Sequence, residues 1–219
     1  MIALDRPDIS PVVIGLQAGR PRDLFLGGQM VRSAIVKSPV IGSVNIGPEG
    51  LDGDSQVDRR AHGGVERALC VYPAVHLAAW GREWGVSLEA GSFGENLTIS
   101  GLDEESVHLG DRFRFGSTLL EVSQPREPCS TLAGRLGHEE VLELIRENGR
   151  TGWYMRVIEP GLAAVGLPFV RERTDPARVS IAEAYRVRLN TRGERAEVRR
   201  LLAVEALSSG WRISLERRL

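Results

Sequence analysis

The stretch Arg112-Phe113-Arg114-Phe115-Gly116-Ser117-Thr118-Leu119-Leu120-Glu121-Val122-Ser123 predicts a β-hairpin with a two-residue turn. Strand-forming residues lie on both sides of Gly116-Ser117, a pair suited to a tight connection. The second arm leads directly into Gln124-Pro125-Arg126-Glu127-Pro128-Cys129-Ser130-Thr131-Leu132, where a cysteine follows two prolines. The hairpin therefore delivers Cys129 at the exit of a strand.

Pro125 and Pro128 restrict the backbone before Cys129 and remove two hydrogen-bond donors, so we expect a stiff, irregular turn there. Arg126 and a helical segment beginning at Ser130 would both lower the pKa of the Cys129 thiol. The thiolate form binds metals and attacks electrophiles. The alternative interpretation is a small buried apolar residue in a proline-rich crossing.

Short strands are predicted along much of the chain, and glycine-rich turns separate them. Only two helices are expected before residue 171, one opened by Pro73 and one over 139–148. This pattern favours a mainly β (α+β) fold with a β-barrel or closed, strongly bent sheet over a βαβ fold. The predicted strands are 11–16, 30–36 after the Gly27-Gly28 turn, 44–46, 69–72, 97–99, and a second hairpin of 152–158 with 162–165.

A polar stretch over 171–176 separates two predicted domains, a β-barrel-like domain over 1–172 and a three-helix module over 176–219. Ser180 and Glu183 form a capping box for the first helix. A second helix is expected over 193–203 and a third from Ser208 or Ser209. So small a module has little core of its own, so we expect it to pack on the main domain or on a partner. No candidate cofactor motif falls in it.

Composition excludes several classes of protein. The chain has 219 residues, 42% of them hydrophobic, and a net charge of −1, which gives no overall argument for nucleic acid. It contains no apolar run long enough to span a membrane, and its first residues do not resemble a signal peptide, so a cytoplasmic location is expected. Two cysteines do not make a disulfide framework. The module carries ten arginines against five glutamates, which predicts a solvated face or, second, a docking surface for an acidic partner.

A second candidate site surrounds the pair Gly63-Gly64. These glycines permit a ligand to approach the backbone closely, and anion-binding side chains flank them. The flanking residues are Arg59, Arg60, His62 and Arg67. Taken alone, the glycine pair fits a tight turn equally well, and His62 by itself is weak evidence.

Three further residues have polar or reactive side chains. Asn96, which follows the small residues from Gly91 onward, is a candidate to line a site. Cys70 lies in the apolar run 69–72, which is typical of a structural residue. His76 on the helix after Pro73 is expected to be partly buried and hydrogen-bonded.

In order and spacing, these motifs resemble the MOSC domain family, named from the C-terminal domain of molybdenum cofactor sulfurase. The resemblance covers about 42–165, and the tail resembles the three-helix appendage of its bacterial members. The matching pieces are Asp52-Gly53-Asp54 through His62-Gly63-Gly64, Tyr72-Pro73, 91–97, Leu109-Gly110-Asp111, 124–132 and Gly152-Trp153-Tyr154.

The resemblance implies a barrel-like β fold that holds a molybdenum cofactor (molybdopterin), with Cys129 as the protein thiolate ligand of the metal. Soft sulfur ligands suit such a metal, and the cofactor supplies the redox chemistry. Within the family, the chain resembles hydroxylaminopurine-resistance proteins, which detoxify N-hydroxylated bases by reducing them to amines. A separate reductase would deliver the electrons. The implied cofactor-binding residues are Arg59, Arg60, His62, Gly63, Gly64, Arg67, Asn96 and Arg126.

Two other functions stay open on the residues alone. One is a carrier of sulfur or of the cofactor that uses Cys129 without turnover. The other is a cysteine-dependent transferase or hydrolase with His62 as base, which lacks an evident orienting partner. Pyridoxal phosphate binding is sometimes attached to the family, but that cofactor normally requires a lysine. Lys37, the sole lysine, lies within a predicted strand and suits this role poorly.

Overall fold

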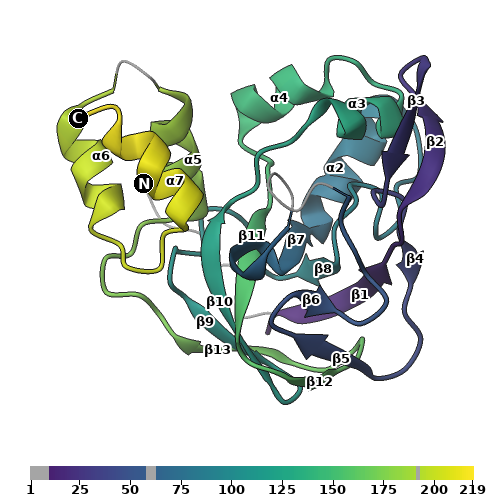
Figure 1. The fold of residues 1–219 in the computed structure, drawn as a ribbon, viewed down its shortest axis with the longest axis horizontal. Helices are drawn as coiled ribbons and strands as arrows, with labels where there is room; N and C mark the ends of the chain where they lie inside the picture. Colours follow the sequence, from purple (N-terminus) through teal and green to yellow (C-terminus); the bar gives the residue numbers. More distant parts are fainter. Residues whose placement is uncertain (1–9, 58–62, 191–192) are drawn as a thin grey trace.

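The protein is built around one long, curled sheet (Figure 1). The computed structural model describes residues 10–57, 63–190 and 193–219. The main sheet has the strand order β13-β9-β10-β11-β7-β8-β1-β4. Its strands are β1 (Val12–Ala18), β4 (Ser38–Pro39), β7 (Leu69–Pro73), β8 (Leu97–Ser100), β9 (Arg112–Phe115), β10 (Thr118–Pro125), β11 (Trp153–Glu159) and β13 (Phe169–Arg173).

The sheet bends until its two sides approach each other. Val12 in β1 forms an isolated antiparallel bridge with Pro168, directly before β13. The backbone N–H of Phe169 donates to the carbonyl of Pro11 at 3.1 Å. The result is a half-barrel, as the predicted mainly β, strongly bent fold requires.

The predicted hairpin is present as β9 and β10. Phe113 and Phe115 point into the core and are fully buried, and the strands pair from Thr118 opposite Phe115. Gly116 in the turn has φ 60°, and a Cβ there would lie 2.2 Å from the carbonyl oxygen of Leu162. The turn therefore requires glycine both for its backbone conformation and for the close approach.

The second predicted hairpin is wrong, although both of its strands exist. β12 (Gly161–Ala163) pairs with β5 (Val44–Gly47) rather than with β11. Since β10 and β7 already occupy the two edges of β11, no edge is left for β12. β5 also pairs with β6 (Gly50–Leu51), which completes a three-stranded sheet.

The chain also contains one βαβ unit that the sequence did not predict. β7 and β8 pair in parallel, and the connection between them includes helix α2 (Ala74–Trp84). Parallel neighbours need such a crossover, and α2 buries Leu77 and Trp80 as it crosses. Pro73 precedes the helix, as expected.

The strand predicted over 30–36 is shorter. β3 (Gln29–Ser33) ends before Val36 and forms a separate hairpin with β2 (Arg22–Leu26), which the sequence did not indicate. Lys37 therefore lies outside any strand.

In the described residues before 171, the structure has three α-helices. Besides α2 they are α3 (Ser130–Leu136), the helical segment expected after Cys129, and α4 (Val141–Asn148). α4 ends at Gly149, which adopts the left-handed conformation at φ 73°. A short 3₁₀ helix, η1 (Val65–Arg67), follows the glycine pair.

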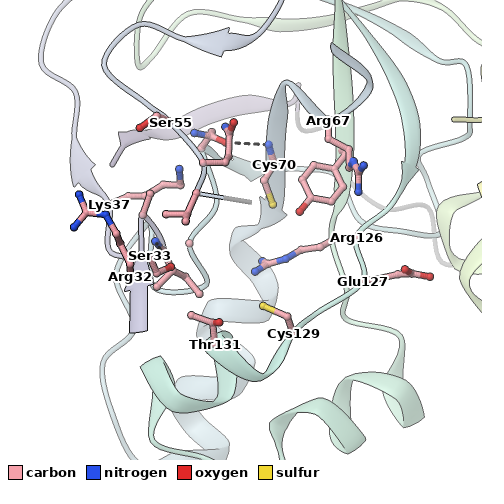
Figure 2. Close-up of a pocket in the computed structure, with 17 residues that line it drawn as sticks. Arg32, Ser33, Lys37, Ser55, Arg67, Cys70, Arg126, Glu127, Cys129 and Thr131 are labelled. Carbon is pink, nitrogen blue, oxygen red and sulfur yellow. Dashed lines mark hydrogen bonds between the residues drawn. The ribbon is translucent and has the colours of Figure 1, made fainter. Parts of the chain in front are cut away.

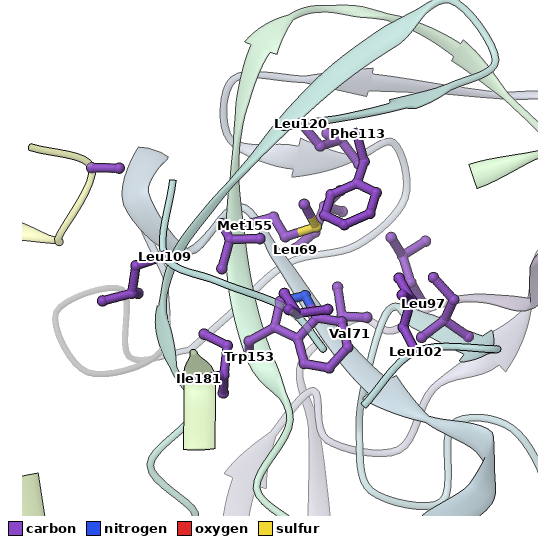
Figure 3. Packing of buried hydrophobic residues seen from close by; sticks show 14 of the residues in the cluster. Leu69, Val71, Leu97, Leu102, Leu109, Phe113, Leu120, Trp153, Met155 and Ile181 are labelled. Carbon is purple, nitrogen blue, oxygen red and sulfur yellow. The ribbon is translucent and has the colours of Figure 1, made fainter. Parts of the chain in front are cut away.

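The three-helix module comprises α5 (Ile181–Leu189), α6 (Arg195–Leu202) and α7 (Ser209–Glu216). Ser180 caps α5, because its Oγ accepts a hydrogen bond from the backbone N–H of Glu183 at 3.0 Å. The module packs on the main sheet as expected, and Ile181 joins the same hydrophobic cluster as Trp153 and Leu109 (Figure 3).

Candidate functional site

The segment 126–129, here called the cysteine loop, connects β10 to α3. It has no regular secondary structure, as the flanking prolines predict. Cys129 is the residue immediately before α3, with an extended backbone at φ −122° and ψ 167°, and its side chain is partly buried. Neither Cys129 nor Cys70 forms a disulfide. The loop therefore presents a thiol where a strand ends and a helix begins.

The cysteine loop lines a cavity of about 270 Å³, here called the cysteine cavity. This volume lies just below the usual range of small-molecule sites, roughly 300–1,000 Å³. Segments far apart in the sequence form its walls. The wall residues used below are Arg32, Lys37, Arg67, Cys70, Asn96 and Tyr154, together with Arg126, Glu127 and Cys129 of the loop.

Arg126 carries a buried charge into this cavity. The residue is only 6% exposed. Its Nη2 donates to the carbonyl of Phe93 at 2.7 Å, but Nη1 has no hydrogen-bond partner within the described chain. Figure 2 shows its guanidinium between Cys70 and Cys129. Burial alone would lower the pKa of Arg126, yet the thiols, Tyr154 and Glu95 around it produce a net upward shift, so the group stays positively charged.

Cys70 lines the same cavity from strand β7. It is 6% exposed, and burial raises the pKa of its thiol although the nearby Arg126 opposes the shift. The sequence correctly indicated a buried residue but not its place on the cavity wall. A neutral thiol is the expected form of Cys70 near neutral pH.

The side chain of Asn96 is hydrogen-bonded to other residues at the cavity wall. Its Oδ1 accepts from the backbone N–H of Cys70 at 3.1 Å, and its Nδ2 donates to Asp54 at 2.8 Å and to the carbonyl of Gln17 at 3.1 Å. These bonds use both ends of the amide. Asn96 therefore fixes the position of Cys70 and Asp54.

The wall residue Lys37 forms a buried ion pair with Asp54. Their side chains are only 6% and 2% exposed. Asp54 Oδ1 also accepts from the backbone N–H of Gly19 at 2.7 Å. Lys37 is thus already engaged by a carboxylate, which argues against a Schiff-base role.

A buried carboxylate shapes the loop beside Arg126. Glu95 is fully buried and accepts from the backbone N–H groups of Gly91 at 2.7 Å and Phe93 at 3.0 Å, and from the hydroxyl of Thr98 at 2.8 Å. The loop that it fixes contributes the Phe93 carbonyl to Arg126. Glu95 therefore stabilises the loop that positions Arg126.

The structure brings together some of the predicted site residues. Arg67, Asn96, Arg126 and Cys129 all line the cysteine cavity. Gly63 and Gly64 are not among the wall residues, and Gly64, at φ 87°, forms the turn that starts η1. Arg59, Arg60 and His62 lie outside the described residues, so their predicted roles stay predictions.

Two family models match the chain. The MOSC domain model matches residues 58–170, and the model described as "YiiM-like, 3-alpha helix domain" matches residues 179–219. The chain belongs to the MOSC domain family. This family is associated with molybdenum cofactor sulfurase.

Curated relatives cover between 68% and 92% of the chain. Protein YiiM of Escherichia coli (strain K12) is 37% identical over 85% of this chain and 84% of its own. The uncharacterized protein YflK of Bacillus subtilis (strain 168) is 36% identical over 92% of this chain and 91% of its own. A protein named "Reductase" from Gibberella moniliformis is 36% identical over 68% of this chain but only 27% of its own.

Solved structures support the fold of this MOSC protein. The crystal structure of YiiM from Geobacillus stearothermophilus superposes with a TM-score of 0.82 at 32% identity and covers 95% of this chain and 99% of its own. Among the described residues of the present chain, no helix is long and apolar enough to cross a membrane.

Several wall residues of this MOSC site escaped the sequence analysis. Lys37 and Arg32 come from the N-terminal segment, and Tyr154 comes from β11. Two signals pointed towards Lys37: it is the sole lysine, and its partner Asp54 belongs to the carboxylate-rich Asp52-Gly53-Asp54 motif. Their convergence depends on tertiary structure.

The donor set fits a molybdenum cofactor. Cys129 offers a soft sulfur ligand at the cavity wall, and Arg126 offers a buried N–H without a partner in the described chain. Arg67 and Arg32 add positive charge to the wall. Anionic groups with several oxygen acceptors are the usual partners of such arginines.

Proposed function

We propose that this protein binds a molybdenum cofactor in the cysteine cavity and reduces N-hydroxylated compounds, such as hydroxylaminopurine-like bases, to amines. One observation carries the proposal. Arg126, nine-tenths buried, lies beside Cys129, and its Nη1 has no hydrogen-bond partner among the described residues. A buried donor without an acceptor costs free energy, so a bound acceptor there is favoured.

The chain's own residues have distinct roles in this proposal. Cys129 supplies the thiolate that holds the metal, and Arg126 donates from Nη1 to an anionic group of the cofactor. Arg67, another wall residue, favours the same negative charge. Asn96 holds strand β7 in place, and Lys37 lies on the wall with its amine engaged by Asp54.

When bound, a molybdenum cofactor supplies the two-electron redox chemistry. Overall, R–NHOH with two electrons and two protons gives R–NH₂ and water, so the N–O bond breaks and an N–H bond forms. The electrons come from a separate reductase. The protein positions the substrate beside Cys129 and limits water in the cavity.

The family assignment and the relative named "Reductase" support an oxidoreductase. The substrate class rests on the resemblance to hydroxylaminopurine-resistance proteins. A carrier of sulfur or cofactor would use the same Cys129, so turnover is the property that distinguishes the two functions.

The test is a reduction assay on full-length protein from a host that makes the cofactor. The assay contains hydroxylaminopurine and an artificial one-electron donor, and amine formation is measured by chromatography. Protein from a cofactor-deficient host is the matched control. Amine formation by the loaded protein alone supports the proposal. Stoichiometric molybdenum without turnover on any N-hydroxylated compound would favour the cofactor carrier, and absence of molybdenum would overturn both the reductase and the cofactor carrier.

A further inference from the structure

Helix α5 of the three-helix module lies against the cysteine loop and its neighbours. Tyr185 and Arg188 are three residues apart on this helix, so they share one face. Each of them contacts a group that fixes the loop, by a different kind of interaction. Arg186, between them, instead pairs with Glu197 of α6 at 2.9 Å, inside the module.

Tyr185 acts on the backbone of the loop. The residue is 4% exposed and packs in a small core with Leu132 of α3. Its hydroxyl lies close to Thr151, and the Thr151 hydroxyl donates to the backbone carbonyl of Arg126. The backbone N–H of Arg126 donates to the carbonyl of Gly152 at 3.0 Å. Both backbone groups of Arg126 are therefore held by the segment that Tyr185 contacts.

Arg188 acts on the next residue of the loop. Its Nε lies 2.9 Å from Oε1 of Glu127, an ion pair rather than a directed hydrogen bond. The guanidinium also lies 5.8 Å from the ring centroid of Trp211 in α7, which restricts its orientation. Glu127 lines the cysteine cavity. Arg188 therefore connects the module to a wall residue.

Helix α7 contacts η1, the short helix that contains the wall residue Arg67. The backbone N–H of Ser209 lies 3.0 Å from a carboxylate oxygen of Glu66, and its hydroxyl donates to the other oxygen at 2.6 Å. Glu66 belongs to η1, beside the wall residue Arg67. The module thus contacts both the cysteine loop and η1.

We propose that Tyr185 and Arg188 are positioning residues, through which the three-helix module holds the cysteine loop in the geometry that presents Arg126 and Cys129 to the cavity. The contacts to Thr151 and Glu127 carry this role. The positioning role itself does not depend on the proposed function. Only the identity of the ligand, a molybdenum cofactor, rests on it.

The test is hydrogen–deuterium exchange on the backbone amides between 126 and 132 in full-length protein. Arg188→Gln should speed this exchange by up to about fivefold, since an exposed ion pair contributes at most about 1 kcal/mol. Tyr185→Phe should act in the same direction, and the double variant should exceed either. Arg186→Gln is the matched control, because its ion pair stays within the module.

Variants that keep the ion pair distinguish a positioning role from a general loss of stability. Arg188→Lys keeps the ion pair and should restore slow exchange, as should the charge reversal Glu127→Arg with Arg188→Glu. Equal acceleration in Arg186→Gln, lack of rescue in both of these variants, or unchanged exchange in both Arg188→Gln and Tyr185→Phe would overturn the inference.

Molybdenum content separates this inference from the proposed function. In protein from a cofactor-producing host, the double variant should contain several-fold less molybdenum than Arg186→Gln. If the exchange results hold while the wild type itself binds no molybdenum, the proposed function fails and the positioning role stands. If the wild type is loaded and exchange is insensitive to both residues, only the positioning role fails.

Discussion

Arg126 Nη2 donates a hydrogen bond to the backbone carbonyl of Phe93 at 2.7 Å, and this bond directs the rest of the guanidinium into the cysteine cavity. Phe93 is itself held by Glu95, which accepts from its backbone N–H at 3.0 Å. The cavity therefore receives a positively charged donor from a rigid support. Such preorganisation favours an anionic ligand, because little is lost in ordering the donor when the ligand binds.

Arg126→Met tests this role. We expect cofactor occupancy to fall at least about tenfold, the loss of roughly one charged hydrogen bond. The free energy of unfolding should change by less than about 2 kcal/mol, because removing a buried charge offsets the lost bond to Phe93. Molybdenum analysis and denaturant unfolding measure the two effects.

Arg135→Met is the matched control. Arg135 also donates to the 91–93 loop, at 3.1 Å to the carbonyl of Ser92, but it does not line the cavity. The cofactor occupancy of the Arg135→Met variant should equal that of the wild type. Equal losses in both variants would mean that Arg126 acts only through the loop.

The buried ion pair of Lys37 and Asp54 should be important for stability. Lys37→Met leaves a buried carboxylate without its cation, and we expect a loss of about 3 kcal/mol in the free energy of unfolding. Asp23→Asn breaks an ion pair with Arg32 whose side chains are 61% and 65% exposed, so it should cost less than about 1 kcal/mol. Denaturant unfolding of both variants compares them. Similar small losses would contradict a buried role for Lys37.

Cys70 should make the protein less stable in alkali. Burial raises its thiol pKa above the ordinary value of 9.0, so the folded state keeps the proton that the unfolded state releases. The stabilisation is present below pH 9.0 and is lost as pH rises through the folded-state pKa.

Cys70→Ala isolates this effect from the buried tyrosines. Above pH 9.0 the wild type should lose stability more steeply than the variant, by up to about 1.4 kcal/mol per pH unit. Denaturant unfolding at a series of pH values gives both slopes. Parallel curves for the two proteins would show that the thiol titrates equally in both states.

Local features of this fold could be predicted from sequence, whereas long-range pairings could not. The β9–β10 hairpin depends on residues next to Gly116, and the end of α4 depends on Gly149. The partner of β12 depends on which edges β10 and β7 leave open, which no local pattern encodes. β5, its actual partner, lies more than a hundred residues earlier in the chain.

The candidate site divides in the same way. Arg126 and Cys129 were found together because they are three residues apart in one proline-flanked loop. Cys70 belongs to a fully buried strand, and nothing in its apolar surroundings distinguishes a cavity wall from a core. The contact of Arg188 with Glu127 joins residues of two domains, so it could be recognised only in the folded protein.

The central claim is that Cys129 holds the metal, and molybdenum content per protein molecule tests it most directly. Wild type, Cys129→Ser and Cys70→Ser are purified from one cofactor-producing host and measured by mass spectrometry of the metal. The account predicts that Cys129→Ser folds but loses its molybdenum, because a hydroxyl is a harder and far less acidic ligand. Cys70→Ser should keep its metal and lose about 1–3 kcal/mol of stability. Full molybdenum in Cys129→Ser would contradict the account.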